Sequence, residues 1–476
     1  MRNSTLKGQT LGGVIWNSIE RFSVIGVQFL VMLVIARLIE PKDFGLVGML
    51  AIFIAISQTV VDSGMPQALI RKTNRTFVDT STVFFFNIAI SFVLYGILWG
   101  IAPFVSDFYN EPLLTSLMRV LCFVIIINSF AVVQRTLFTA SIDFKTQAKI
   151  SLIAAVVSGV ISIFLAIEGA GAWALVWQQL VNSFVSAILL WTYSSWRPKF
   201  VYSWNSFWDF FSYGSKLLAS GLLETIYRNL YSLIIGKYFS ASNLGQYTQA
   251  KNYTQLPSAT VSSVLSKVIF PVLCNIQGEN ERLKDIYRRM LRLSCFIIFP
   301  LMCGLASLSH PVVEVTIGNK WSFAADIILP LCFSGMWYPV HALNLDLLQV
   351  KGRSDLFLRI EIIKKIIGTL TLFLSIPYGV MFMCYVSILT SIVSLFINTY
   401  YTGKLINVDF ITQMKDVMGS LSVSFAMFIF IYSLTLIMDN NIIKIIVGII
   451  SGAVFYLLSA YIFNFKELDY LKDIVK

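Results

Sequence analysis

The sequence predicts an all-α integral membrane protein with about 14 transmembrane helices. Two observations lead to this prediction. Hydrophobic residues make up 57% of the 476 residues and charged residues only 13%, whereas a soluble globular chain carries about 25% charged residues. Apolar stretches of about 20 residues, enough to cross a ~30 Å hydrocarbon core as a helix, recur along almost the whole chain. The loops between them are too short to hold a catalytic domain.

The predicted spans follow one another with short connections, so neighbouring helices run in opposite directions through the membrane. Each is a mostly apolar run bounded by charged residues, glycine or proline. In chain order they are Leu11–Leu38, Phe44–Ala68, Ser81–Ile101, Leu114–Val133, Ile150–Ile167, Ala170–Tyr193, Phe210–Ile235, Leu244–Leu265, Leu291–Leu308, Ala324–Leu347, Leu358–Ile376, Tyr378–Tyr400, Val417–Met438 and Ile442–Phe463.

The formal net charge of +11 is unevenly distributed among the loops. Alternate loops are rich in lysine and arginine, as in Arg71–Arg75 and Arg282–Arg289, while the loop from Pro103 to Leu113 has neither. Positive loops stay in the cytoplasm, so both termini are expected there. Topology therefore accounts for the basic balance, and no nucleic-acid partner is expected. The basic segment Glu281–Arg292 is expected to lie on the anionic leaflet or to recruit an assembly protein.

An internal repeat divides the chain. "ARLIEPKDFGLV" (Ala36–Val47) matches "GKYFSASNLGQY" (Gly236–Tyr247), and "APFVSDFYNE" (Ala102–Glu111) matches "HPVVEVTIGNK" (His310–Lys320). The order and spacing indicate a duplicated unit of six helices, hence two lobes related by an axis along the membrane normal. We expect an N-terminal lobe at 1–200, a C-terminal lobe at 201–402, and two further helices with a cytoplasmic tail at 403–476.

Four segments of the sequence resemble the polysaccharide flippases of the multidrug/oligosaccharidyl-lipid/polysaccharide exporter superfamily. These are "ARLIEPKDFGLVGM", "DSGMPQALIRK", "GKYFSASNLGQYTQAKNYTQLP" and "VIFPVL", in an order that covers roughly the first 400 residues. The resemblance implies a transporter that moves a polyprenyl-diphosphate-linked oligosaccharide repeat, here an undecaprenyl carrier, across the inner membrane by alternating access. It implies a role in surface polysaccharide biosynthesis, with membrane lipid and polysaccharide assembly proteins as partners. It does not identify the sugar.

Charged residues inside the predicted helices are the candidate substrate site, because a charge at the bilayer centre costs at least about 2.5 kcal/mol. Arg21 follows Glu20 roughly 15 Å into the first helix. Glu224 and Arg228 share one face of the seventh helix, and Lys251 begins the eighth.

Arg119, in the fourth helix, completes this candidate set. Arginine suits a diphosphate because its planar guanidinium makes bidentate hydrogen bonds. We therefore expect Arg21, Arg228, Lys251 and Arg119 to bind the diphosphate in a central cavity. Glu20 and Glu224 are expected as their charge partners or as gate residues. The alternative is that these charges are compensated structural pairs.

Three further titratable residues are candidates for coupling transport to an ion gradient. His341 and Asp346 lie in the tenth helix with Asn344 between them, and Asp62 precedes Gly64 and Pro66. A proton relay is one interpretation of the histidine; a buried, hydrogen-bonded histidine is the other. For Asp62 the alternatives are cation coupling and a helix end or kink.

Several function classes are disfavoured. The sequence has no GxxxxGK[ST] loop, no HExxH and no His/Cys metal spacing, so neither a cofactor nor ATP hydrolysis is expected. A membrane glycosyltransferase or polymerase would need charged periplasmic loops that this chain lacks. A multidrug or cation exporter of the same superfamily is the main alternative, but the net basic set of intramembrane residues favours an anionic substrate.

Overall fold

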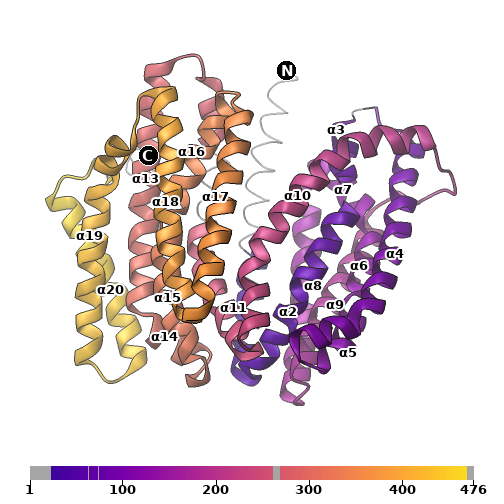
Figure 1. Cartoon of the computed structure of the whole chain (residues 1–476), viewed down its shortest axis with the longest axis horizontal. Helices are drawn as coiled ribbons and strands as arrows, with labels where there is room; N and C mark the ends of the chain where they lie inside the picture. Colours follow the sequence, from indigo (N-terminus) through magenta and orange to yellow (C-terminus); the bar gives the residue numbers. More distant parts are fainter. Residues whose placement is uncertain (1–22, 63, 73, 261–268, 469–476) are drawn as a thin grey trace. The chain divides into compact units, whose positions relative to one another are not determined.

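In a computed structural model of the chain, residues 23–62, 64–72, 74–260 and 269–468 are described, and their regular structure is entirely helical (Figure 1). Ten helical segments are long and apolar enough to cross a membrane. The all-α, multi-pass prediction is confirmed. The ten segments are Pro41–Arg71, Phe77–Tyr109, Leu113–Ala140, Phe144–Ile167, Ala172–Tyr193, Asn280–Ser307, Asn319–Val350, Val380–Ile406, Phe410–Ile437 and Asn441–Ile462.

Helices also occupy the described parts of the other four predicted spans. Ser23–Leu38 is a shorter apolar helix within the described residues. The helix α10 (Trp204–Tyr238) has 35 residues and is therefore about 52 Å long. The helix α11 (Ala241–Gln255) continues as a π-helical turn at Leu256–Thr260, and α17 covers Ser354–Ser375. The last three fall outside the ten because they carry more charged or polar side chains within the span.

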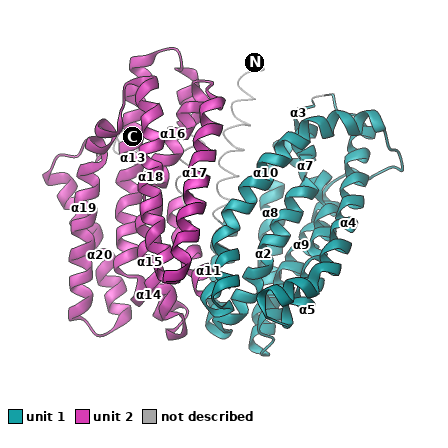
Figure 2. Cartoon of the chain, in the orientation of Figure 1, with its two compact units in different colours: residues 1–245 teal, residues 246–476 magenta. Residues whose placement is uncertain are grey.

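The chain forms two compact units, Met1–Gly245 and Gln246–Lys476 (Figure 2). Unit 1 contains α10, which packs on three earlier helices: α2 (Pro41–Asp62), α3 (Met65–Arg71) and α4 (Phe77–Tyr109). The division by packing therefore falls after α10, whereas the boundary expected from the repeat lies at residue 200. The remaining helices of unit 1 are α5 (Leu113–Leu121), α6 (Phe123–Ser129), α7 (Val132–Ala140), α8 (Phe144–Ile167) and α9 (Ala172–Tyr193).

One end of unit 1 is held by an aromatic core. Phe84, Phe207 and Phe210 are buried there, and the indole of Trp196 donates to the hydroxyl of Thr80 at 3.0 Å. Nearby, the turn into α4 is closed by a reciprocal cap in which Thr76 and Asp79 satisfy each other's backbone N–H groups. Such caps satisfy orphan donors at a helix start, so this end of the unit is fixed by local sequence as well as by packing.

The two copies of the repeated motif meet inside unit 1. A Cβ added to Gly45 would lie 1.6 Å from the carbonyl oxygen of Ala241, and one added to Gly245 would lie 1.8 Å from the carbonyl oxygen of Pro41. The starts of α2 and α11 therefore cross backbone against backbone. Only glycine permits this approach, which explains why glycine recurs at the same place in both copies.

Unit 2 is built around α13 (Asn280–Ser307). This helix packs on α15 (Ser322–Gly335), α16 (Tyr338–Val350), α18 (Val380–Ile406), α19 (Phe410–Ile437) and α20 (Asn441–Ile462). The unit also contains α14 (Ser309–Thr316), which packs on α15 and α20. The last two helices, α19 and α20, lie outside the sequence repeat. Even so, among the helices that pack on α13, α19 makes the most extensive contact.

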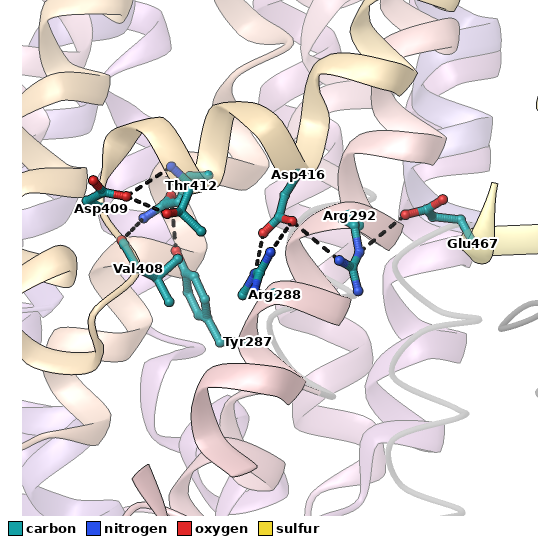
Figure 3. Close-up of polar contacts among 9 residues, drawn as sticks. Tyr287, Arg288, Arg292, Val408, Asp409, Thr412, Asp416 and Glu467 are labelled. Atoms are coloured by element: carbon teal, nitrogen blue, oxygen red, sulfur yellow. Dashed lines mark hydrogen bonds and ion pairs between the residues drawn. The ribbon is translucent and has the colours of Figure 1, made fainter. Parts of the chain in front are cut away.

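An ionic network fastens α19 to α13 (Figure 3). The carboxylate of Asp416 accepts two hydrogen bonds of 2.7 Å from the guanidinium of Arg288 and lies 3.3 Å from Arg292. Arg292 in turn pairs with Glu467, beyond α20, at 3.4 Å. Asp409 caps α19 by accepting from the backbone N–H of Thr412 at 3.0 Å. The network joins three segments of the chain that are far apart in sequence.

Candidate functional site

A polar pocket of about 450 Å³ lies within unit 1, among α2, α6, α7 and α9. We call it the polar pocket. Its amide, hydroxyl and guanidinium groups stand out in a helical unit that is otherwise largely apolar. The lining residues are Ala51, Ile54, Ala55, Gln58, Val124, Asn128, Arg135, Gln179, Asn182, Ser183 and Ser186.

The local sequence explains why these groups converge. On α9, residues 179, 182, 183 and 186 follow the i, i+3, i+4, i+7 spacing and therefore form one polar stripe. On α2, Ala51 and Ala55 precede Gln58 on the same side of the helix, and their small side chains leave room for the pocket. Asn128 and Arg135 are seven residues apart, about two helical turns, and lie on either side of the short break between α6 and α7.

Hydrogen bonds order one wall of the pocket. The amide of Asn128 donates to the side-chain oxygen of Gln58 at 3.2 Å, and the amide of Gln58 donates to Asp62 at 3.2 Å. Asp62 also interacts electrostatically with Arg135. This wall therefore presents oriented donors and acceptors together with one cation. Such a lining can hold a neutral polar ligand, for example sugar hydroxyls, more readily than an apolar one.

Among the predicted site residues that the structure describes, only Asp62 joins this arrangement, although it lies beside the lining rather than in it. It is the last residue of α2, and the chain turns at Gly64, whose φ of 69° is left-handed, before α3 begins at Met65. The expected helix end beside Gly64 and Pro66 is confirmed. The carboxylate bonds back to Gln58 instead of capping α3, and its proposed part in ion coupling stays a prediction.

The other predicted charged site residues that the structure describes do not line the polar pocket. Glu224 and Arg228 are exposed, one turn apart on α10, and Lys251 is half-buried on α11; each makes further contacts. Arg119 stacks on Trp99, with its guanidinium carbon 4.1 Å from the ring centre, in a different groove of unit 1. Glu20 and Arg21 lie outside the described residues. Their assignment to one diphosphate site stays a prediction.

His341 sits in a polar cluster of unit 2. One ring nitrogen lies 3.1 Å from the hydroxyl of Ser391 and the other 3.1 Å from the amide of Asn398, so the ring bridges α16 to two turns of α18. Asn344, which separates His341 from Asp346 in sequence, donates instead to the carbonyl of Val340 and to Gln413. A relay through Asn344 therefore has no support in these contacts, and the coupling roles of His341 and Asp346 stay predictions.

Sequence reasoning missed the polar pocket itself. It searched for intramembrane charges, and Gln58, Asn128 and the stripe on α9 are mostly neutral. The periodic stripe on α9 is the signal that would have found it. Within the part of the chain that the structure describes, no group of three His, Cys, Asp or Glu side chains is placed to hold a metal ion.

A family profile described as "Polysaccharide biosynthesis protein" matches residues 34–326, more than half of the chain. The chain belongs to this polysaccharide biosynthesis family. The family resemblance noted from its sequence motifs is thereby confirmed.

Relatives in this family match along much of their length. The teichuronic acid biosynthesis protein TuaB of Bacillus subtilis is 25% identical over 457 residues, covering 94% of each chain. The lipopolysaccharide biosynthesis protein WzxC of Escherichia coli is 24% identical, covering 76% of this chain and 74% of its own. The succinoglycan biosynthesis transport protein ExoT of Rhizobium meliloti is 23% identical, covering 67% and 65%.

Solved structures show the same fold. The lipid II flippase MurJ, in an inward closed conformation, superimposes with a TM-score of 0.78 at 14% identity, covering 97% of this chain and all of its own. An inward-facing MATE family multidrug resistance transporter superimposes with a TM-score of 0.61 at 15% identity, covering 82% and 98%. The polysaccharide biosynthesis family member described here therefore has the flippase and MATE fold, as predicted.

Proposed function

We propose that this protein is a flippase that moves undecaprenyl-diphosphate-linked oligosaccharide repeat units from the cytoplasmic to the periplasmic leaflet, for surface polysaccharide biosynthesis. The polar pocket carries the proposal. A transporter of lipid-linked sugar needs a place inside its membrane region where hydroxyl groups exchange water for protein hydrogen bonds, because an unpaired buried hydroxyl is costly. The family and its relatives, which are named for teichuronic acid, lipopolysaccharide and succinoglycan biosynthesis, support the same substrate class.

In this proposal the substrate is divided between two kinds of side chain. Sugar hydroxyls meet the amides and hydroxyls of the polar pocket, while the diphosphate meets Arg21, Arg228 and Lys251, with Glu20 and Glu224 as charge partners. Arg119, which was expected in the same set, lines a different groove and is left out of this proposal. Guanidinium groups keep their charge and bind phosphate oxygens in pairs. The lipid tail stays in the bilayer. Transport proceeds by alternating access, for which the two compact units supply two bodies that move.

Orientation and energy supply are parts of the same proposal. The loop charges favour an inner-membrane protein with both termini in the cytoplasm. Asp62, His341 and Asp346 are the residues proposed to couple transport to an ion gradient, because a titratable group inside a membrane helix is by default a functional candidate.

The test is translocation in proteoliposomes. A fluorescent undecaprenyl-diphosphate oligosaccharide is loaded in one leaflet, and its arrival in the other is followed for wild type, Gln179→Leu and Gln178→Leu. The two glutamines are neighbours on α9, but only Gln179 lines the polar pocket. We expect Gln179→Leu to slow translocation about three- to tenfold, the effect of losing one or two neutral hydrogen bonds. Gln178→Leu is expected to transport at the wild-type rate.

The alternative function is export of drugs or cations, which the shared MATE fold favours. The same proteoliposomes decide between the two. Efflux of a cationic dye without movement of the lipid-linked sugar would replace the flippase proposal with the exporter. Equal translocation rates for Gln179→Leu and Gln178→Leu would be compatible with a flippase, but would show that the sugar does not bind in the polar pocket.

A further inference from the structure

A second groove, of about 600 Å³, runs along unit 1 between α4, the α5–α6 pair and α9. We call it the Arg119 groove. It is almost entirely aromatic and aliphatic, apart from one guanidinium and one phenol. Its lining residues are Tyr95, Trp99, Arg119, Val120, Phe123, Ile127, Trp177, Leu180, Val181 and Phe184.

Arg119 has no anionic partner among the residues that the structure describes. Its guanidinium lies over the face of Trp99, and its Nε atom is buried without a hydrogen-bond partner. No carboxylate of the described residues pairs with it. Arg288 and Arg292, by contrast, share Asp416. A cation–π contact offsets only part of the cost of removing a guanidinium from water. The groove therefore contains a guanidinium whose Nε–H has no acceptor.

The groove has a charged end and an apolar end. Arg119 lies six residues from the start of α5, and Trp177 lies five residues from the start of α9, so both are near one end of their helices. Along α5 and α6, Phe123 and Ile127 follow Arg119 by one and two turns, which carries the apolar lining about 12 Å further into the span. Tryptophan and tyrosine at the charged end are the side chains that membrane interfaces favour.

We propose that the Arg119 groove binds an anionic phospholipid. Its headgroup phosphate would pair with Arg119, and one acyl chain would lie along Phe123, Ile127 and Phe184. A guanidinium beside an aromatic face suits a phosphate diester, because the diester supplies the missing acceptor oxygens and charge. The apolar end has the chemistry of a lipid tail. This site does not depend on the proposed transport function.

The groove and the polar pocket use opposite sides of the same helix. On α9, residues 179, 182, 183 and 186 line the polar pocket, while residues 177, 180, 181 and 184 line the Arg119 groove. On α6, Ile127 and Asn128 divide in the same way. A lipid seated in the groove would therefore pack against the back of the polar pocket's wall.

The experiment is lipid retention measured by native mass spectrometry of the purified full-length protein. Phosphatidylglycerol and phosphatidylethanolamine are offered in equal amounts to wild type, Arg119→Gln and Arg71→Gln, first alone and then with undecaprenyl diphosphate as a competitor. Arg71 is the matched control, because it also lies over an aromatic ring, that of Tyr213 at 4.9 Å, but does not line the groove. A third variant, Ile127→Trp, fills the apolar end and leaves Arg119 in place.

We expect wild type to retain one phosphatidylglycerol in preference to phosphatidylethanolamine. Arg119→Gln should weaken that retention about tenfold, as for a charge-assisted hydrogen-bonded pair. Ile127→Trp should weaken it as well, and Arg71→Gln should change it less than twofold. If Arg119→Gln fails to fold, the Ile127→Trp result decides the proposal.

Three outcomes would overturn the proposal. Equal retention by wild type and Arg119→Gln would show that the guanidinium binds no lipid phosphate. Equal losses in Arg119→Gln and Arg71→Gln would indicate general surface attraction. In the third outcome, wild type retains undecaprenyl diphosphate, phosphatidylglycerol cannot displace it, and Arg119→Gln abolishes the retention. That result would assign the groove to the lipid carrier instead.

Discussion

Replacing Asp416 by asparagine removes the one carboxylate that Arg288 and Arg292 share (Figure 3). Breaking a fully buried ion pair costs about 3–5 kcal/mol, and an exposed pair contributes about 0–1 kcal/mol. The Asp416 side chain is 5% exposed, but Arg288 and Arg292 keep 31% and 21% exposure, so water replaces part of what the arginines lose. We therefore expect Asp416→Asn to lower the free energy of unfolding by about 2–3 kcal/mol.

The assay is denaturant unfolding of the purified protein in detergent, followed by tryptophan fluorescence. The matched control is Glu279→Gln, which breaks the Arg282 pair of the same helix, where the side chains are 63% and 58% exposed. That variant should stay within about 0.5 kcal/mol of wild type. A double-mutant cycle of Asp416→Asn with Arg288→Met should give a coupling energy above about 1 kcal/mol. Two results would refute the reasoning: additive changes in unfolding free energy in the double-mutant cycle, or equal losses of unfolding free energy in Asp416→Asn and Glu279→Gln.

Three further predictions concern stability. Gly45→Ala should destabilise the protein by about 3 kcal/mol or more, since the new Cβ meets a backbone carbonyl that cannot rotate away. Gly96→Ala is the control: its Cβ would have no atom within 4 Å, so it should be neutral or stabilising by up to about 1 kcal/mol. Thermal unfolding of the two variants side by side checks this. Asn344→Leu should cost about 1–3 kcal/mol in the same assay, because it removes both hydrogen bonds that the buried Asn344 and Gln413 amides exchange and leaves Gln413 only its bonds to Val408 and Tyr287. A loss no greater than that of an exposed polar residue would contradict it. The hydrogen bonds from Thr412 lower the pKa of Asp409 below its ordinary value of 3.8, so the cap stabilises α19 fully above pH 3.8 and is lost as the pH falls through the lowered pKa. The protection factors of the amides at the start of α19, which correct for the intrinsic pH dependence of exchange, should therefore fall with acid in wild type and be already low at pH 7 in Asp409→Ala.

The sequence predicted the helices better than the sites. Apolar length alone located the spans, because lipid requires each backbone to satisfy its own hydrogen bonds in a helix. Even α10 and α17, which are more polar, were located from their apolar runs. The turn at Gly64 was predicted because glycine and proline act locally.

The polar pocket could not be found by the same reasoning. Its residues come from four helices, and most are uncharged, so neither charge nor composition marks them. The neighbours of Arg119 were equally hidden. Trp99 precedes it by twenty residues and Trp177 follows it by fifty-eight, and only helix packing brings all three side chains into one groove. Helix periodicity shows which residues share a face, but it does not show which helix that face meets.

The crossing of Gly45 with Ala241 and of Gly245 with Pro41 also bears on how this chain changes over time. In most duplicated proteins the two copies drift independently, because each copy meets its own neighbours. Here each copy of the motif is the neighbour of the other, so a side chain gained in one segment collides with the backbone of its twin. Mutational drift in the two segments is therefore coupled. This gives a physical reason why two copies of the motif that lie two hundred residues apart can still be recognised in the sequence.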